Sequence, residues 1–346
     1  MSCESEGGSP YQQTQFAPSI PTVTPNPDSL RSLAAKDGFF VGSAASPGQI
    51  TDPAFSNLLA GEFNMLTPEN AMKWEIVHPD PDRYDFSQGD LLVDFARQHG
   101  MAVRGHVLVW DLQMPSWVTG SEHPRREWIQ ILCTHIKTVV SHYRGQIYAW
   151  DVVNEAVNTD GTLRNTFWMQ AIGPEYIAMA FQWAREADPS ARLFYNDNGG
   201  EGLNTKSQAI YMLVKGLQGS GIPIDGVGLQ MHTALYVAPS VSALTENMRR
   251  LSYLGVEIHI TEMDVRLQHA SDSSEVKLAA QAETYRQVLG ACLSVENCRA
   301  FATWGLTDRY SWIPSWTGTP DAPLLFDESG SPKPAFIAVQ ELLARR

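Results

Sequence analysis

The sequence lacks several features that mark whole classes of protein. None of its apolar runs approaches the roughly 18 residues that a membrane-spanning helix needs, and residues 1–16 lack the apolar segment of a signal peptide. Basic residues are few, 25 against 38 acidic ones, so the formal net charge is −13. A phosphate binder needs a basic stripe and none appears, so we expect no nucleic-acid partner and no anionic membrane surface. We also expect no obligatory protein partner.

Cysteine is also scarce. Four cysteines in 346 residues do not make a disulfide scaffold. Cys133 lies among apolar residues at helical spacing, and we expect it to pack in a helix as a reduced, small hydrophobe. Cys292 and Cys298 flank a turn-like Ser-Val-Glu-Asn and are predicted to form a disulfide in an oxidising compartment. No His/Cys/Asp spacing is typical of a metal site, and we expect neither metal nor cofactor.

The N-terminal stretch has too few apolar residues to bury a core. Cys3 opens a segment rich in Ser, Gly, Glu, Pro and Gln that runs to Pro27. We interpret residues 1–28 as a flexible tether and residues 29–346 as one catalytic domain. A cysteine at the head of such a tether is similar to the lipidated first residue of a mature bacterial lipoprotein, although a functionless thiol in a disordered tail is an open alternative. We expect a secreted, cell-surface or periplasmic protein, with a possible lipid anchor at Cys3.

The remainder of the chain alternates extended apolar runs with helix-like segments. The eight extended runs are residues 39–44, 63–67, 102–110, 147–155, 192–196, 226–232, 257–262 and 300–304. Helical spacing of apolar residues, as in 124–143, separates them. This alternation predicts a single (β/α)₈ TIM barrel with its active site at the C-terminal face of the strands. The alternative, an open doubly wound sheet, would carry a Gly-rich loop after its first strand, where this chain has Ala-Ala-Ser-Pro.

Two of the predicted strands end on glutamates. Glu155 closes Trp-Asp-Val-Val-Asn-Glu, and Glu262 closes Ile-His-Ile-Thr-Glu. A retaining glycosidase needs two carboxyl groups about 5–5.5 Å apart, and two barrel strands that open on one face can supply them. Trp110, Trp304 and Trp312 fall at or after strand ends, where sugar-stacking platforms would lie. We therefore predict that Glu155 is the acid/base and Glu262 the nucleophile.

The motifs around these residues extend the pattern over most of the chain. In order they are residues 67–75, 104–106 with 108–110, 150–156, 228–232, 260–264, 303–305, 308–312 and 332–335. Together they resemble glycoside hydrolase family 10, the β-1,4-endoxylanases. The resemblance runs from about Phe39 to the C-terminus. It implies hydrolysis of bonds inside xylan with retention of configuration, with xylan and xylo-oligosaccharides as substrates.

The resemblance also implies a role for individual residues. Asn154 would bond the 2-hydroxyl of the sugar being cleaved, and His232 would bond the nucleophile with Asp264 behind it. The other residues that the resemblance places in contact with sugar are Lys73, His106, Trp110 and Gln230 at the cleavage point, and Glu69, Asn70 and Gln113 toward the non-reducing end. Trp304 and Trp312 would close over the cleavage site. Beside an ionised Glu262 in a partly dry cleft, Glu155 is expected to hold a proton near neutral pH.

Two local departures from the family lie on the predicted active-site face. Asp111 stands where the family has His, and the segment 198–202, Asn-Gly-Gly-Glu-Gly, replaces Tyr-Asn after Asn196-Asp197. Both leave the glutamates intact but affect the leaving-group side. Two rival functions stay open: a cellulase or mannanase of the same architecture, and a barrel that binds polysaccharide without cutting it. The Lys73-Trp74-Glu75 block and Ala156 after Glu155 favour a xylanase over the first rival.

Overall fold

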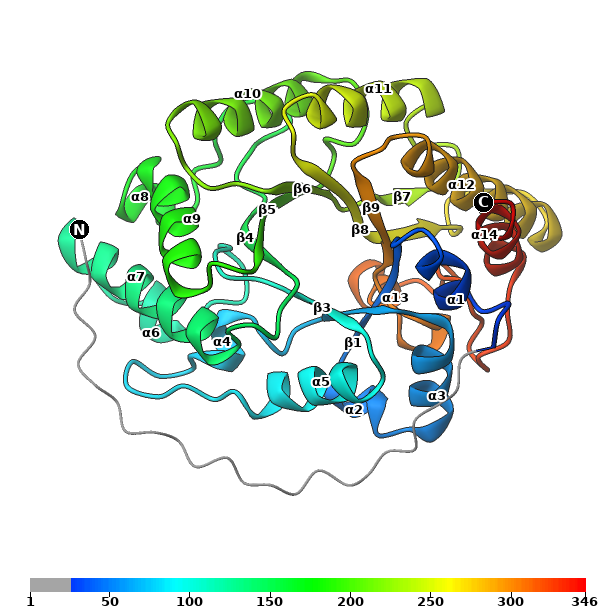
Figure 1. Ribbon diagram of the computed structural model, residues 1–346, viewed down its shortest axis with the longest axis horizontal. Coiled ribbons are helices and arrows are strands. Elements are labelled where there is room, and N and C mark those ends of the chain that lie inside the picture. Colours follow the sequence, from blue (N-terminus) through cyan, green and yellow to red (C-terminus); the bar gives the residue numbers. More distant parts are fainter. Residues whose placement is uncertain (1–25) are drawn as a thin grey trace.

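The computed structural model describes residues 26–346 and shows a closed ring of parallel strands surrounded by helices (Figure 1). The ring runs from β1 to β6 in chain order, continues through β8 and β9, and closes where β9 pairs with β1. A short ninth strand, β7, pairs only with the last residues of β8. The strands are β1 Phe40–Ala45, β2 Met65–Pro68, β3 Ala102–Gly105, β4 Ala149–Asn154, β5 Arg192–Asp197, β6 Gly226–Leu229, β7 His232–Ala234, β8 Glu257–Arg266 and β9 Cys298–Thr303. The predicted barrel is confirmed, and closure excludes the open sheet.

Helices surround the ring, although the short α13, Ile313–Thr317, overlaps the strands in this view (Figure 1). They are α1 Leu30–Ala35, α2 Pro47–Ile50, α3 Pro53–Glu62, α4 Trp74–Val77, α5 Ser87–Gln98, α6 Ser116–Thr119, α7 Arg125–His142, α8 Phe167–Ala171, α9 Glu175–Ala187, α10 Thr205–Gly219, α11 Val241–Ser252, α12 Ser274–Leu293, α13 Ile313–Thr317 and α14 Pro334–Ala344, with a 3₁₀ turn at Asp308–Tyr310. The longer ones bury the faces that the sequence spacing predicts. In α7, for example, Trp128, Leu132 and Ile136 are buried. Asp52 caps α3 ahead of Pro53, because its side chain accepts a hydrogen bond from the amide of Ala54.

The barrel interior beneath the mouth holds a buried ion pair. Arg104, on β3, is 1% exposed and donates to both oxygens of Asp151 on β4. The same guanidinium lies 2.8 Å from Nδ1 of His259 on β8 and over the ring of Phe194. Burial alone would raise the pKa of Asp151, but Arg104 and His106 outweigh it and hold that pKa below its usual range. Asp151 is therefore a fixed anion on which His106 can be oriented.

Three predicted runs end more than two residues from the observed strand ends, and the other five agree within two residues. The run predicted over 102–110 ends as a strand at Gly105, although Val109 still pairs with Val153. The run over 226–232 divides into β6 and β7 because the chain turns at Met231, whose φ is 66°. Gln230 and His232 therefore do not share one strand face. β8 continues four residues past Glu262 instead of stopping there. In each case the apolar pattern predicted the strand, and its end was set by loop contacts that the pattern does not encode.

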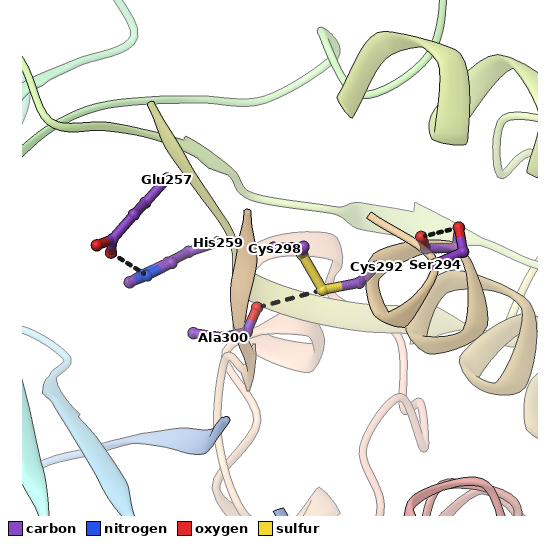
Figure 2. Close-up of a disulfide and its surroundings, with 7 residues drawn as sticks. Glu257, His259, Cys292, Ser294, Cys298 and Ala300 are labelled. Atoms are coloured by element: carbon purple, nitrogen blue, oxygen red, sulfur yellow. Dashed lines mark hydrogen bonds and ion pairs between the residues drawn. A yellow bond between two sulfur atoms is a disulfide. The ribbon is translucent and has the colours of Figure 1, made fainter. Parts of the chain in front are cut away.

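The predicted disulfide is present. Cys292 at the end of α12 and Cys298 at the start of β9 are bonded, with their Cα atoms 5.3 Å apart (Figure 2). Cys133 is buried in α7, as expected, but it is disulfide-bonded too, so the prediction that it stays reduced is wrong. Its apolar neighbours explain its burial, and they carry no information on its oxidation state.

Residues 1–25 of the predicted tether, and with them the predicted lipid anchor at Cys3, lie outside the described residues, which begin at residue 26. The first helix, α1, begins at Leu30, and Gln340 of α14 donates to the backbone oxygen of Asp28. Within residues 26–346, no helix combines the length and apolarity needed to cross a bilayer.

Candidate active site

Glu155 and Glu262 are joined by one chain of hydrogen bonds at the C-terminal ends of the strands. Nε2 of Gln230 donates to Oε1 of Glu155 and to Oδ1 of Asn154, both at 3.1 Å. Nδ2 of Asn196 donates to the same Asn154 oxygen at 2.9 Å and to Oε1 of Glu262 at 2.7 Å. Four hydrogen bonds through three amide side chains therefore fix the two carboxylates relative to each other.

Glu262 lies at the head of a second chain of hydrogen bonds. Its Oε2 is 3.1 Å from Nε2 of His232, whose Nδ1 is 2.7 Å from Oδ2 of Asp264. Trp312 donates to the same Asp264 oxygen at 2.9 Å. Burial lowers the pKa of His232, but the two carboxylates outweigh it and raise that pKa to about 10. His232 is thus a cation near neutral pH, and it lies against the Glu262 carboxyl group although the chain turns between Gln230 and His232.

Glu155 follows β4 in the left-handed backbone region, with a φ of 56°. A non-glycine residue in this region persists only when its surroundings hold it there. Its amide donates to the backbone oxygen of Asn196 at 2.9 Å, and its Oε2 accepts from Nε1 of Trp110 at 3.2 Å. Nη1 of Arg164 donates both to Oε2, at 3.1 Å, and to the backbone oxygen of Glu155, at 3.0 Å. Sequence reasoning missed Arg164 and assigned Trp110 to sugar rather than to this carboxylate.

A polar cluster lies beside the glutamates, on the loops after β2 and β3. Lys73 is 6% exposed and donates to Oδ1 of Asn70 at 2.8 Å and to Oε1 of Gln113 at 2.6 Å. Its ammonium lies 5.0 Å from the ring centre of Trp110. Burial raises the pKa of Glu69 in spite of Lys73 nearby, and burial lowers the pKa of Lys73 in spite of the surrounding glutamates. The predicted sugar-binding residues of this side are therefore brought together.

His106 and Trp304 lie together at the base of the candidate active site. Nδ1 of His106 lies 2.9 Å from Oδ2 of Asp151, and the His106 ring is 5.0 Å from that of Trp304, which is buried. His106, Asp151 and Glu262 each have one potential metal-ligand atom within 4.8 Å of those of the other two, a spacing that would suit a metal ion. Arg104 already neutralises Asp151. We therefore interpret the three residues as polar groups at the base of the active site and not as metal ligands.

The opposite side of the mouth is more open. The loops after β5, β6 and β7 and the end of β8 surround a cavity of about 390 Å³ that reaches His232 and is lined by Glu201, Asn204 and Arg266 among others. The departure segment 198–202 forms its wall. There Oε1 of Glu201 accepts from the amides of Gly199 and Met231, at 3.0 and 3.2 Å. Burial raises the pKa of Glu201. Gly200, Glu201 and Gly202 of this segment are therefore buried, whereas Gly199 is exposed.

Sequence reasoning found both glutamates and their polar neighbours because each follows a predicted strand. Asn196 was recognised at a strand end but was given no role. Arg164 is nine residues beyond Glu155, and a short antiparallel pairing of Val157 with Leu163 returns the chain to the site. The turn-forming Asn-Thr-Asp-Gly between them was the available signal for this hairpin.

A (β/α)₈ barrel with two hydrogen-bonded carboxylates at its strand ends has the architecture of a glycoside hydrolase. The family model described as glycosyl hydrolase family 10 matches residues 29–342, so the chain belongs to that family. Over 320 residues it is 43% identical to the endo-1,4-beta-xylanase B of Thermotoga neapolitana, covering 92% of each chain. It is 38% identical to endo-1,4-beta-xylanase 1 of Humicola insolens, covering 91% of this chain and 74% of that protein.

Solved structures agree with this assignment. The crystal structure of xylanase 10B from Thermotoga petrophila in complex with xylobiose matches with a TM-score of 0.89 at 43% identity, covering 92% of this chain and 97% of that one. A Penicillium canescens endo-1,4-beta-xylanase matches with the same TM-score at 34% identity, covering 92% and 98% of the two chains. The family resemblance drawn from the motifs is confirmed.

Proposed function

We propose that this protein is an endo-1,4-β-xylanase that cuts bonds inside xylan with retention of anomeric configuration. The observation that carries the proposal is the hydrogen-bonded chain Glu155–Gln230–Asn154–Asn196–Glu262. It supports a fixed, short carboxylate separation, which in a retaining enzyme is about 5–5.5 Å. The names of the family relatives support the substrate.

In the proposed first step, the carboxyl of Glu155 gives its proton to the glycosidic oxygen. The bond between C1 and that oxygen breaks while an oxygen of Glu262 bonds to C1. In the second step Glu155, now a carboxylate, takes a proton from water, the water oxygen bonds to C1, and Glu262 is released as a carboxylate. The His232 cation supports Glu262 as nucleophile and leaving group. Proton transfer of this kind contributes about 10²–10⁴-fold.

The aromatic wall bears on the choice of sugar. Trp304 is buried beside His106, and the ring of Trp312 lies 5.2 Å from that of His232. We infer that these rings leave little room for the hydroxymethyl group of glucose, so a xylose backbone is preferred over cellulose or mannan. Soluble products released from xylan, cellulose and mannan separate these alternatives. Release of none from any xylan would revive the alternative of binding without cutting.

The mechanism is tested by treating the two glutamates differently. Glu262→Ala should abolish turnover of every substrate. Glu155→Ala should nearly stop xylan hydrolysis but spare the first step with an aryl xylobioside whose leaving group needs no proton. Azide should then restore turnover of Glu155→Ala and give a β-azide. An α-azide, or an α-anomer as the first product of the wild type, would sink the assignment of both roles.

We also propose that the protein is exported, because the disulfide between Cys292 and Cys298 is stable in an oxidising compartment. The lipid anchor expected at Cys3 requires that Cys3 is not the partner of Cys133, the other disulfide-bonded cysteine. Mass spectrometry of the N-terminal peptide from the native host tests this. A thioether-linked lipid and a disulfide at Cys3 exclude each other, so a peptide in which Cys3 is joined to another cysteine overturns the anchor.

A further inference from the structure

The acid/base in the proposed mechanism has a cation against it. Arg164 donates to Oε2 and to the backbone oxygen of Glu155 through one nitrogen, Nη1. The amide of Arg164 donates to the backbone oxygen of Ala156 at 2.8 Å, and the Val157–Leu163 pairing closes the hairpin. Arg164 is therefore fixed at both its backbone and its guanidinium, and it holds the left-handed conformation of Glu155.

This contact creates a chemical difficulty. A guanidinium hydrogen-bonded to a carboxylate favours the charged form. Glu155 must carry a proton when the leaving oxygen departs and must be a carboxylate when water attacks. If Arg164 had no other partner, it would assist only the second of these steps.

Asp111 offers that other partner. Its Oδ2 lies 3.7 Å from Nη2 of Arg164, and its Oδ1 is buried with no hydrogen-bond partner among the described residues. A buried carboxylate oxygen without a donor is costly, and a guanidinium with five N–H groups can satisfy it. Asp111 follows Trp110, whose indole bonds the same Glu155 oxygen as Arg164 does. One of the two departures from the family therefore stands beside the residue that holds Glu155.

We propose that Arg164 is a positioning residue that exchanges partners during turnover: it holds the Glu155 carboxylate and moves onto Asp111 when Glu155 carries a proton. The proposal rests on the acid/base role proposed for Glu155. Asp111 keeps the guanidinium bound while Glu155 acts as acid, and Arg164 returns to Glu155 once the proton has left. Neither residue touches the reacting atoms, so both act through Glu155.

Other charged groups around Glu155 stay the same in this exchange. Lys73 faces it from the loop after β2, Asp197 from the end of β5 and Glu262 from β8. Tyr176, on α9, lies near both Asp111 and Arg164, and burial raises its pKa to about 12, so it is neutral at working pH. Asp111 and Arg164 are thus the pair whose substitution changes the charge beside Glu155 without touching the Lys73 cluster or the nucleophile.

The test is the pH–rate profile of kcat/KM on xylohexaose, whose alkaline limb reports loss of the catalytic proton. Asp111→Asn, which leaves Arg164 bound to Glu155 alone, should move that limb to lower pH by about half a unit to one unit. Arg164→Met should move it to higher pH by a similar amount and should lower kcat more than it changes KM. Arg164→Lys should restore part of the lost kcat. The double variant should match Arg164→Met, because Asp111 acts through Arg164.

The controls separate this proposal from the proposed function. With a 2,4-dinitrophenyl xylobioside, whose departure needs no proton, the Asp111→Asn limb should not move. If Glu155→Ala fails to impair xylan hydrolysis, the acid/base role itself is wrong. If Glu155→Ala behaves as proposed but Asp111→Asn and Arg164→Met shift the limb in the same direction, or not at all, the partner exchange alone is wrong. Should Arg164→Met fail to fold, the direction of the Asp111→Asn shift decides the matter.

Discussion

The two sides of the barrel mouth are built in different ways. On the loops after β2 and β3, the buried Lys73 is bonded to Asn70 and Gln113 and lies against Trp110. On the far side of the ring, Arg266 at the end of β8 lines an open cavity beside the loops after β5, β6 and β7. The first side is organised before any sugar arrives, so it should bind with little reorganisation. The second side is less rigidly held, so it should accommodate different bound groups with a smaller loss of binding energy than the first side.

The support beneath the two sides differs as well. Directly after Lys73, Trp74 stacks on His135 with ring centres 3.5 Å apart and donates to the backbone oxygen of Leu108 at 2.7 Å. Trp168 and His78 lie within 5.6 Å of the same Trp74 ring. The opposite side is walled by the glycine-rich segment 199–202, held by Asn247, which donates to the backbone oxygens of Gly200 and Glu201 at 2.9 Å. Aromatic packing thus fixes one side, and hydrogen bonds to a loop backbone fix the other.

The largest expected effect comes from removing the cation of the organised side. Lys73→Met should lower kcat/KM on xylohexaose about 100-fold, roughly 3 kcal/mol, because Asn70 and Gln113 lose a buried charged donor and the sugar loses a contact. Lys215→Met, on the exposed face of α10, is the matched control. A loss of less than about 5-fold would show that the buried network is not preorganised for binding.

The second effect is on stability in acid. Burial lowers the pKa of His78 to about 4, and burial with the neighbouring His78 holds the pKa of His135 well below its usual value. Each lowered pKa means that the unfolded chain binds the proton more readily. The contribution of these two neutral histidines to the free energy of unfolding is therefore fully present above about pH 6.5 and is lost as pH falls toward 4. For His78 the shift corresponds to about 3 kcal/mol.

Urea unfolding at pH 7 and at pH 4.5 measures this dependence. His78→Phe, which cannot titrate, should lose less stability between the two conditions than the wild type does. His269→Gln, at an exposed position after β8, is the control and should follow the wild type. Equal pH dependence in His78→Phe and the wild type would contradict the assignment of acid sensitivity to the cluster under the organised side.

The same comparison separates what the sequence could predict from what it could not. The residues of the Lys73 side were placed at the mouth by the resemblance to the family, and the structure brings them together: Asn70 and Lys73 are three residues apart on one loop, whereas Gln113 reaches Lys73 from 40 residues away. The two glutamates were foreseen because each belongs to a β-branched run that reaches the mouth. Fold class followed from the regular alternation of apolar runs and helices.

The other side and the setting of Glu155 depend on long-range geometry. Periodicity predicts a strand through Met231, but the chain turns there, and its amide bonds Glu201, 30 residues away in sequence. Arg164 reaches Glu155 through a hairpin whose length and register no apolar pattern specifies. Cys133 was rightly placed in a buried helix, yet burial says nothing of its bonding. Contacts of this kind follow from the closed barrel and not from any one segment.

The smallest expected effect comes from the open side. Nε of Arg266 lies 3.4 Å from the backbone oxygen of Thr233, and its guanidinium lies over Trp316, which is 60% exposed. No carboxylate of the described residues is in ion-pair distance, so Arg266→Met breaks no salt bridge and should leave the melting temperature nearly unchanged. The cation–π contact that holds the guanidinium is exposed and worth only about 0.5–1 kcal/mol. Any contact that Arg266 makes to sugar is therefore loosely held, and kcat/KM on xylohexaose should fall only about 2- to 5-fold. With an aryl xylobioside, whose leaving group does not extend over this cavity, the ratio to wild type should be close to one. A loss of about 50-fold or more on xylohexaose would show that the open side is as preorganised as the Lys73 side, because a loosely held guanidinium cannot supply that much binding energy.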